Sequence, residues 1–386
     1  MNKKRVLMVS YLSFFPPDQG NRRRVYNFIK LIQDKGYIVD YLYYGHVRPE
    51  TKNEMCECLG EGQFIYFPLK YDNPYIWHSK WSMFGRLAPL DRTDSFYEPS
   101  IARKVNVLLK RRKYSILWLE YIMQSKLFDF IETPIVKVID THDRFAYRNF
   151  RLYPYAHSNV GYSITYSGER KALGRADYVI AIQKTEEAYF NKLLKGKKTK
   201  VVTIGDSHTF VANKLNDSHD ICFIGSKNEL NIDGINWFIQ YVFPLITNKI
   251  KDCRLFIVGK ICDAVHVKKK NVMCLGCVDD LEEIYHNCRI VVNPVRAGTG
   301  LNIKSIEAVA HCKPFVTTPA GARGLRFREP ILITATNEFE FAESVCEFLC
   351  NDEACQKYID NCFEFINAYN RNNMKAMDKV LKEELF

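Results

Sequence analysis

The stretch Val292-Asn-Pro-Val-Arg-Ala-Gly-Thr-Gly-Leu-Asn-Ile-Lys-Ser-Ile-Glu-Ala308 places a glycine-containing loop between an apolar strand and an amphipathic helix. Gly298 and Gly300 let the backbone approach an anion closely, and the first N–H groups of the helix face the same point. Lys304 adds a positive charge one turn into the helix. Glu307 lies on the same helix face and can accept hydrogen bonds from a ribose diol. The pattern predicts a phosphate and ribose site; the alternative is an ordinary strand-to-helix turn with a surface Lys and Glu.

The size and cysteine content of the chain indicate two domains in a reducing compartment. Its 386 residues exceed what one hydrophobic core usually serves. No apolar run reaches the roughly 20 residues of a membrane-spanning helix, and the N-terminal apolar run is too short for a signal peptide. The 13 cysteines therefore predict reduced thiols in a cytoplasmic protein. Cys274 and Cys277 form a lone Cys-x-x-Cys, which favours thiols packed in the core over a metal site.

The positive charge is concentrated in the first half of the chain. Residues 1–200 carry 34 Lys and Arg against 20 Asp and Glu, whereas residues 201–386 carry 21 against 24. The basic clusters at 22–24 and 110–113 suit an anionic membrane face, a pyrophosphate-bearing acceptor or nucleic acid, or they are solvated helix faces. No zinc-finger or RNA-binding signature is present, so we expect no nucleic-acid partner. Peripheral contact with the inner face of the cell membrane remains the expectation.

Strand and helix patterns alternate along both halves. Short apolar runs predict strands, and helical periodicity such as Val25, Phe28, Ile29 and Ile32 separates several of them, which is typical of a parallel sheet covered on both faces. The polar stretch 205–219 lacks periodicity and is interpreted as a linker. The predicted strands are 5–10, 38–44, 64–67, 116–119, 135–139, 178–182 and 200–204, followed by 221–224, 255–258, 272–275, 290–292, 315–318 and 331–333.

The predicted organisation is therefore α/β, with two doubly wound Rossmann-like domains in series. The first would span residues 1–204 and bind an acceptor, and the second would span 205–363 and bind a nucleotide. The polar helical tail, 364–386, is long enough to cross back to the first domain. An aromatic and basic stretch, 70–99, suits a headgroup interface or an acceptor groove, or is an insertion packed on its own domain.

The order of several motifs resembles the GT-B glycosyltransferases, and more narrowly the family 4, or group 1, retaining glycosyltransferases. The resemblance spans nearly the whole chain and is strongest from Cys222 to Leu325. The pieces in family order are Phe223-Ile-Gly-Ser226, Asn231-Ile-Asp-Gly234, Phe256-Ile-Val-Gly259, Leu275-Gly-Cys-Val-Asp279, Asn293-Pro, Gly298-x-Gly300, Lys304, Glu307-Ala308 and Thr317-Thr-Pro-Ala-Gly321.

The resemblance implies roles for individual residues. Glu307 would bind the ribose, Lys304 would hold the donor diphosphate with Arg296 as a second cation, and His142 would lie beside the transferred sugar. Gly20, in the loop after the first strand, would approach the phosphates. The turn at 276–278 would offer main-chain groups to the nucleobase. The donor-binding set predicted in this way is Gly20, Gly225, Ser226, Gly276, Cys277, Val278, Arg296, Gly298, Thr299, Gly300, Leu301 and Asn302.

Two features bear on the chemistry. Thr299 stands where many members of the family carry the first Glu of their Glu-x7-Glu motif. The sequence contains no Asp-x-Asp, so the resemblance implies a metal-independent enzyme without a cofactor, in which fixed cations and dipoles neutralise the leaving group. The resemblance also implies a nucleotide-sugar donor and a glycan or polyprenyl-linked acceptor, as in bacterial surface polysaccharide or glycoconjugate synthesis.

Other functions stay open at this point. A nicotinamide-dependent oxidoreductase is disfavoured because no Gly-x-Gly-x-x-Gly follows a first strand. A GT-B nucleotide-sugar epimerase would share the fold and the nucleotide grip, and a non-catalytic glycosyltransferase-like binding subunit is motivated by Thr299.

Overall fold

The computed structural model describes residues 3–45, 49–68, 93–155, 162–267, 269–278, 280–298, 303–325 and 333–382. These residues separate into two compact units. Unit 1 comprises residues 1–151, 160–206 and 372–386, and unit 2 comprises 152–159 and 207–371. Most of the aromatic stretch predicted at 70–99 lies outside the described residues, as do the predicted site residues 299–302.

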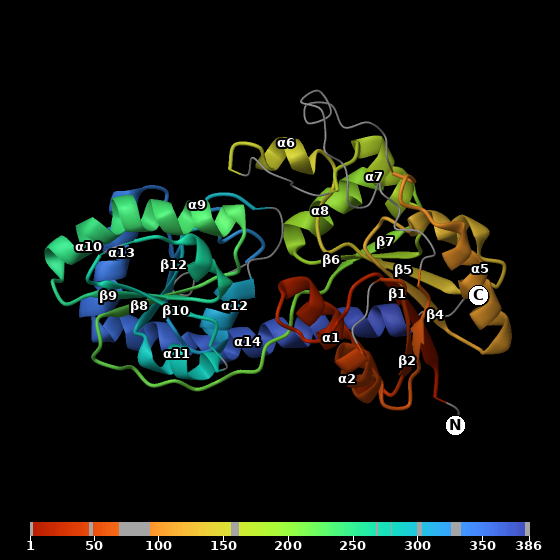
Figure 1. Cartoon of the computed structure of the whole chain (residues 1–386), viewed down its shortest axis with the longest axis horizontal. Coiled ribbons are helices and arrows are strands. Elements are labelled where there is room, and N and C mark those ends of the chain that lie inside the picture. Colours follow the sequence, from red (N-terminus) through yellow and green to blue (C-terminus); the bar gives the residue numbers. More distant parts are fainter. Residues whose placement is uncertain are drawn as a thin grey trace. The chain divides into compact units, whose positions relative to one another are not determined.

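Unit 1 contains a seven-stranded, fully parallel sheet in the order β3-β2-β1-β4-β5-β6-β7. Helices lie on both sides of it (Figure 1). Its elements are β1 (Arg5–Ser10), α1 (Gly20–Asp34), β2 (Ile38–Tyr43), α2 (Pro49–Leu59), β3 (Phe64–Tyr66), α5 (Pro99–Arg111), β4 (Ile116–Glu120), the 3₁₀ helix η1 (Ser125–Phe130), β5 (Val136–Asp140), α6 (Arg148–Leu152), α7 (Tyr166–Leu173), β6 (Tyr178–Ala181), α8 (Lys184–Leu193) and β7 (Lys200–Thr203).

Alternate residues of β1 serve the two faces of this sheet. Val6 and Met8 belong to a core with α1 and α2, whereas Leu7 and Val9 belong to a core with α5, α7 and α8. Because both faces are covered, the strand reads as a continuous apolar run rather than an alternating one. This is why its predicted range, 5–10, coincides with the observed one.

Unit 2 contains a six-stranded parallel sheet in the order β10-β9-β8-β11-β12-β13. Helices again lie on both sides (Figure 1). Its elements are β8 (Asp220–Ile224), α9 (Glu229–Trp237), the π-helix η2 (Phe238–Val242), α10 (Phe243–Lys249), β9 (Arg254–Val258), the 3₁₀ helix η3 (Lys260–Ala264), β10 (Val272–Gly276), α11 (Leu281–Asn287), β11 (Ile290–Asn293), α12 (Ile303–Ala310), β12 (Phe315–Thr317), β13 (Ile333–Thr334), α13 (Glu338–Cys350) and α14 (Asp352–Leu381).

The C-terminal helix differs in extent from the predicted tail. Helix α14 begins at Asp352 rather than near residue 364, because Cys355 and Tyr358 on its first turns are buried in the core of unit 2. Its last turns belong to unit 1, where Met377 and Leu381 are buried. There the Tyr37 hydroxyl donates to the Leu381 carbonyl at 2.7 Å. The prediction that the tail returns to the first domain therefore agrees with the packing within unit 1.

The cysteines are all free thiols, as expected. The prediction that Cys274 and Cys277 pack in the core is wrong, because both are exposed. Cys274 lies on β10, an edge strand of its sheet, and Cys277 directly follows that strand.

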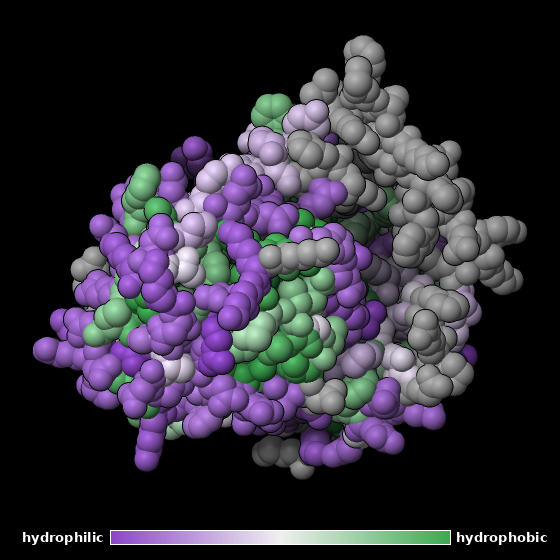
Figure 2. Space-filling model, turned by 60° about the vertical axis from the view of Figure 1, so that its left-hand side comes forward, coloured by the Kyte–Doolittle hydropathy of each residue, from purple (hydrophilic) through white to green (hydrophobic). Residues whose placement is uncertain are grey.

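Within the described residues, no helix is long and apolar enough to cross a membrane. The face drawn in Figure 2 is mostly hydrophilic, with hydrophobic residues gathered near the middle of the view.

Candidate functional site

Each sheet reverses its strand order next to its first strand, at β1/β4 in unit 1 and at β8/β11 in unit 2. Doubly wound sheets bind ligands outside the carboxyl ends of the strands at such a point. In unit 2 the predicted residues Gly225 and Ser226 follow β8, while Arg296 and Gly298 follow β11. The topology therefore brings the two predicted donor-binding segments to one edge of one sheet.

Asn231 joins the loop after β8 to helix α12. It lies on the first turn of α9, where the side chain of the N-cap residue Asn228 accepts a hydrogen bond from its N–H at 2.9 Å. The Asn231 side chain donates to the Ser226 carbonyl at 2.9 Å and accepts from the Lys304 Nζ at 2.8 Å. A buried amide thus fixes both the loop after β8 and the lysine of α12.

Lys304 is a half-buried ammonium group on the first turn of α12. Its Nζ also lies 4.5 Å from the centroid of the Phe223 ring, a cation–π contact. Burial lowers the pKa of Lys304 to about 7, and the charge of Glu307 offsets part of this effect. Its hydrogen bond goes to the neutral amide of Asn231 rather than to a carboxylate. An approaching anion would therefore raise the pKa of Lys304 and favour its charged form.

Glu307 is buried one turn further along α12, with 8 % of its surface exposed. The base of the same helix is fixed by Asn293, whose side-chain amide donates to the Ser305 hydroxyl at 2.9 Å. The Asn293 carbonyl accepts from the Thr317 hydroxyl at 2.8 Å, which ties β11 to β12. Lys304 and Glu307 thus share a helix that is anchored to the sheet edge, as the sequence predicted.

Arg296 and Gly298 are positioned differently from Lys304. The Arg296 guanidinium makes a bidentate ion pair with Asp233, with distances of 2.9 and 2.5 Å. Its charge is therefore already balanced within unit 2. The Gly298 carbonyl accepts a hydrogen bond from Arg323 at 2.5 Å. Thr299, Gly300, Leu301 and Asn302 lie outside the described residues.

The predicted nucleobase turn begins at Gly276, the last residue of β10. Gly276 has a φ of +71°, and a Cβ added there would meet no atom within 4 Å, so backbone conformation alone favours glycine. Its N–H donates to the Cys262 sulfur at 3.3 Å, which holds the turn against η3. Cys277 is exposed and Val278 is partly buried against the core. The turn presents backbone groups at the surface of unit 2.

In unit 1 the predicted residue Gly20 is the first residue of α1, which follows β1. Its neighbour Asn21 donates from its side chain to the Tyr121 hydroxyl at 3.3 Å. The Tyr121 ring stacks on the His142 ring with centroids 4.1 Å apart. Through this chain of contacts, the N-terminus of α1 is linked to the predicted sugar-binding histidine.

His142 lies two residues after the end of β5 and is buried, with a φ of +56°. A non-glycine residue rarely adopts this conformation, which is typical of functional sites. Its Nε2 lies 2.5 Å from Glu120 Oε2 and 3.3 Å from Asp140 Oδ2. Burial raises the pKa of Glu120, and the neighbouring charge of Asp140 acts in the same direction, whereas the hydrogen bond from His142 opposes it.

Asp140 is in turn held by Arg24. The guanidinium donates from Nε and Nη2 to the two carboxylate oxygens, both at 2.6 Å. Arg24 is buried, so the interpretation of residues 22–24 as a surface cluster is wrong for this residue. Glu120, Asp140 and His142 are close enough to hold a metal ion. However, Arg24 already balances the charge of Asp140. Arg24, Asp140, His142 and Glu120 therefore form one continuous hydrogen-bond network.

Three connecting residues of these sites were missed from the sequence, namely Asn231, Glu120 and Arg24. Each makes its contact across more than 20 residues of sequence. In the sequence, Glu120 is marked by its place as a charged residue at the end of an apolar strand. Asn231 is marked by its place in one of the motifs that resemble the family. Arg24 gave a misleading signal because it lies in a run of three arginines.

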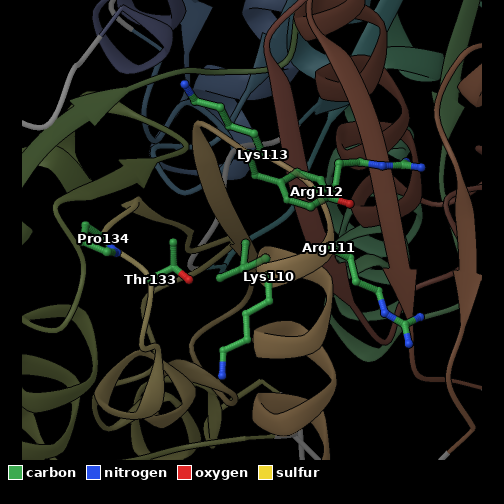
Figure 3. A pocket seen from close by; sticks show the side chains of 8 residues that line it. Lys110, Arg111, Arg112, Lys113, Thr133 and Pro134 are labelled. Carbon is green, nitrogen blue, oxygen red and sulfur yellow. The ribbon is translucent and has the colours of Figure 1, made fainter.

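The second predicted basic cluster, 110–113, borders a cavity of about 350 Å³ in unit 1. Figure 3 shows its labelled basic side chains directed away from one another. Lys110 pairs with Glu132 at 2.6 Å, and Arg112 pairs with the buried Asp40 at 2.9 Å. Arg111 and Lys113 are exposed. The charges therefore form a spread basic surface rather than a convergent anion pocket.

Comparison with solved structures shows that the chain shares the fold of GT-B glycosyltransferases. A structure of Anabaena Alr3699/HepE in complex with UDP and glucose superposes with a TM-score of 0.63 at 14% identity, covering 98% of this chain and 100% of that one. S. aureus TarM in complex with UDP gives a TM-score of 0.68 at 11% identity, covering 98% and 100%. Sucrose-phosphate synthase from Thermosynechococcus elongatus gives 0.68 at 14%, covering 98% of each chain. The predicted fold class is confirmed.

One family model matches part of the second half of the chain. Residues 218–351 match the family described as "Glycosyl transferases group 1", and this match confirms the resemblance predicted from the sequence. A curated relative, "Uncharacterized 44.6 kDa protein in cps region" of Klebsiella pneumoniae, is 24% identical over 191 residues. That match covers 46% of this chain, and the chain spans about half the length of the relative, 49%.

Proposed function

We propose that the protein is a retaining glycosyltransferase that moves a sugar from a nucleotide-diphosphate donor to a glycan or lipid-linked acceptor. The observation that carries the proposal is Lys304, a half-buried ammonium group whose hydrogen bond goes to an amide and whose pKa falls to about 7. A bound diphosphate raises that pKa, since a nearby negative charge favours the charged form of a lysine. Binding of the donor thereby favours the charged form of the lysine that holds its diphosphate.

The same charge serves the chemistry. As the anomeric bond breaks, negative charge grows on the departing diphosphate, and a fixed cation in a partly desolvated site stabilises it. Lys304 and the amide dipoles at the start of α12 are the groups proposed for this role, and no divalent ion is needed for it. The acceptor hydroxyl attacks the anomeric carbon from the face that the diphosphate leaves and gives its proton to the departing phosphate. Configuration is therefore retained without a carboxylate nucleophile.

Similar proteins support the donor and the setting. The Anabaena and S. aureus structures contain UDP, the latter together with alpha-GlcNAc-glycerol. The Klebsiella relative is described as lying in a cps region. We infer a hexosyl donor and a role in bacterial surface polysaccharide or glycoconjugate synthesis in the cytoplasm.

The test combines turnover and binding. The full-length protein is incubated with UDP-, GDP-, dTDP- and ADP-sugars and with a polyprenyl diphosphate-linked sugar, and the products are separated by mass spectrometry. Sugar transfer with retained configuration supports the proposal. Epimerised donor, or binding of all donors without any reaction, contradicts it in favour of an epimerase or a non-catalytic subunit.

Calorimetry of nucleotide binding at about pH 8 in buffers of different ionisation enthalpy should show proton uptake, which Lys304→Met should abolish.

We further propose that the basic surface at residues 110–113 holds the protein on an anionic membrane, where a lipid-linked acceptor would reside. Several basic side chains pointing in different directions suit a diffuse layer of headgroups better than a single phosphate. Attraction of this kind is worth about 1 kcal/mol per basic residue near the surface and weakens with salt.

A charge-matched comparison tests this proposal. Replacing Lys110, Arg111 and Lys113 by Glu should abolish co-sedimentation with phosphatidylglycerol vesicles at low salt. Replacing Lys195, Lys197 and Lys198 in the same way changes the net charge equally at another exposed site of unit 1. Equal loss of vesicle binding in both triple variants would show that only overall charge matters.

A further inference from the structure

The surroundings of His142 determine which of its two ring nitrogens can meet a substrate. Nε2 faces two carboxylate oxygens, Glu120 Oε2 at 2.5 Å and Asp140 Oδ2 at 3.3 Å. Both are acceptors when ionised, so Nε2 must carry a hydrogen to bond with them. Among the residues that the structure describes, none hydrogen-bonds to Nδ1.

The Glu120 carboxylate is itself fixed in orientation. Its second oxygen, Oε1, accepts a hydrogen bond from the Trp118 indole N–H at 2.8 Å. Trp118 is fully buried and can only donate, so this oxygen is permanently occupied as an acceptor. Oε2 is therefore the oxygen left for His142, and neither group can exchange its role by rotating.

The histidine ring is also prevented from turning over. Tyr121 stacks on it with an interplanar angle of 8°. Both Tyr121 and His142 have positive φ values, 67° and 56°, which set the direction of their side chains at the ends of β4 and β5. A 180° ring flip would place Cε1 instead of Nε2 opposite Glu120 and would therefore lose the 2.5 Å contact.

We propose that Glu120 is a positioning residue, which holds His142 in the tautomer with hydrogen on Nε2 and so presents Nδ1 as a hydrogen-bond acceptor. The inference rests on the proposed function, in which His142 lies beside the transferred sugar. The matching ligand group is a hydroxyl that donates to Nδ1. A site that bonds a hydroxyl discriminates strongly against an analogue lacking it, so Glu120 contributes to selection of hydroxylated over deoxy sugars.

The Arg24–Asp140 pair completes the same arrangement. Because Arg24 occupies both oxygens of Asp140 at 2.6 Å, Asp140 is the weaker partner of Nε2 and Glu120 the stronger. Removing the charge of Glu120 therefore changes the hydrogen bonding of the ring more than it changes the packing around it.

The direct test reads the tautomer without any enzyme assay. In protein labelled with ¹⁵N-histidine at about pH 8, two-bond ¹H–¹⁵N correlations should show His142 with hydrogen on Nε2 only, assigned by comparison with His142→Asn. In Glu120→Gln, Trp118 still needs the amide oxygen, so the amide N–H₂ faces Nε2 and the hydrogen should move to Nδ1. Glu169→Gln removes another buried carboxylate of unit 1 and should leave the His142 signals unchanged.

Hydrogen on Nδ1 in the unaltered protein, or an unchanged tautomer in Glu120→Gln, overturns the proposal. This result does not depend on turnover, so it separates failure of the positioning role from failure of the proposed transferase activity. If transfer is observed, Glu120→Gln should lower kcat at least ~10-fold with nucleotide affinity and Tm nearly unchanged. It should also reduce discrimination among mono-deoxy donor sugars, which a loss of stability alone would not do.

Discussion

Lys304 makes folding stability depend on pH in a direction opposite to that of an ordinary surface lysine. Burial lowers its folded-state pKa to about 7, below the ordinary value of 10.5, so the unfolded chain binds more protons between these values. The free energy of unfolding should therefore rise as pH increases through this range. Lys304→Met should be more stable than the parent at pH 7, by on the order of 1 kcal/mol after allowance for solvent screening.

Urea denaturation at several pH values measures this effect. The difference between the variant and the parent should shrink toward pH 10, where Lys304 is already neutral in the folded protein and is losing its charge in the unfolded chain. A constant difference across the range would show that the ammonium is fully solvated in the folded protein. Nucleotide affinity of Lys304→Met should fall at least ~10-fold even where its stability is higher.

Glu307 is predicted to recognise the ribose of the nucleotide. Glu307→Ala should lower affinity for a ribonucleoside diphosphate by about 10-fold, while affinity for the 2′-deoxy analogue should change little. Calorimetric titration of both nucleotides against both proteins gives the four dissociation constants required. If the variant keeps the preference of the parent for the ribonucleotide, another residue contacts the ribose.

These two residues could be predicted from the sequence because their relation is local. Two residues three positions apart on one helix share a face whatever the rest of the fold does. Asn231 could not be assigned its role, since its contact with Lys304 exists only because β8 and β11 are neighbours in the sheet. Glu120 and His142 are likewise joined by the pairing of β4 with β5.

Among the elements, the turn after β10 offers a prediction about its glycine. Gly276→Ala adds a methyl group in open space, so its cost is the strain of a positive φ, about 1 kcal/mol or more. Gly298→Ala also meets no atom within 4 Å, but Gly298 lacks a positive φ and should lose no stability. Chemical denaturation of both variants makes the comparison, and equal effects would mean that the turn adapts without strain.

Elements were predictable where apolar runs are short and bounded by polar residues, as in β1 and β8. The sequence pattern over 232–248 predicts one continuous helix, whereas the structure contains the π-helical segment Phe238–Val242 within it. The altered hydrogen bonding of so short a segment leaves no periodic signal in the sequence. Exposure of Cys274 was not predictable either, because strand order decides which strand lies at a sheet edge.

At the scale of the whole molecule, the chain contributes to unit 1 at both ends. Met377, on the last turns of α14, is fully buried in the core beside β1 and β2, although 165 residues separate Asp206 from the re-entry at Asn372. Met377→Ala should destabilise unit 1 by about 2–4 kcal/mol through loss of buried apolar surface and the cavity that remains. Lys35, which pairs with Asp378 at 2.8 Å, cannot compensate, since a partly exposed ion pair is worth little.

Met374 supplies the matched control, because it lies one turn earlier on the same helix and is 43% exposed. Met374→Ala should change the free energy of unfolding by less than about 0.5 kcal/mol. Limited proteolysis, with the fragments identified by mass spectrometry, assigns the destabilisation to unit 1. Nucleotide affinity should survive in Met377→Ala, since the proposed donor-binding residues Lys304 and Glu307 belong to unit 2. Loss of nucleotide binding in step with unfolding of unit 1 would mean that the donor site depends on both units.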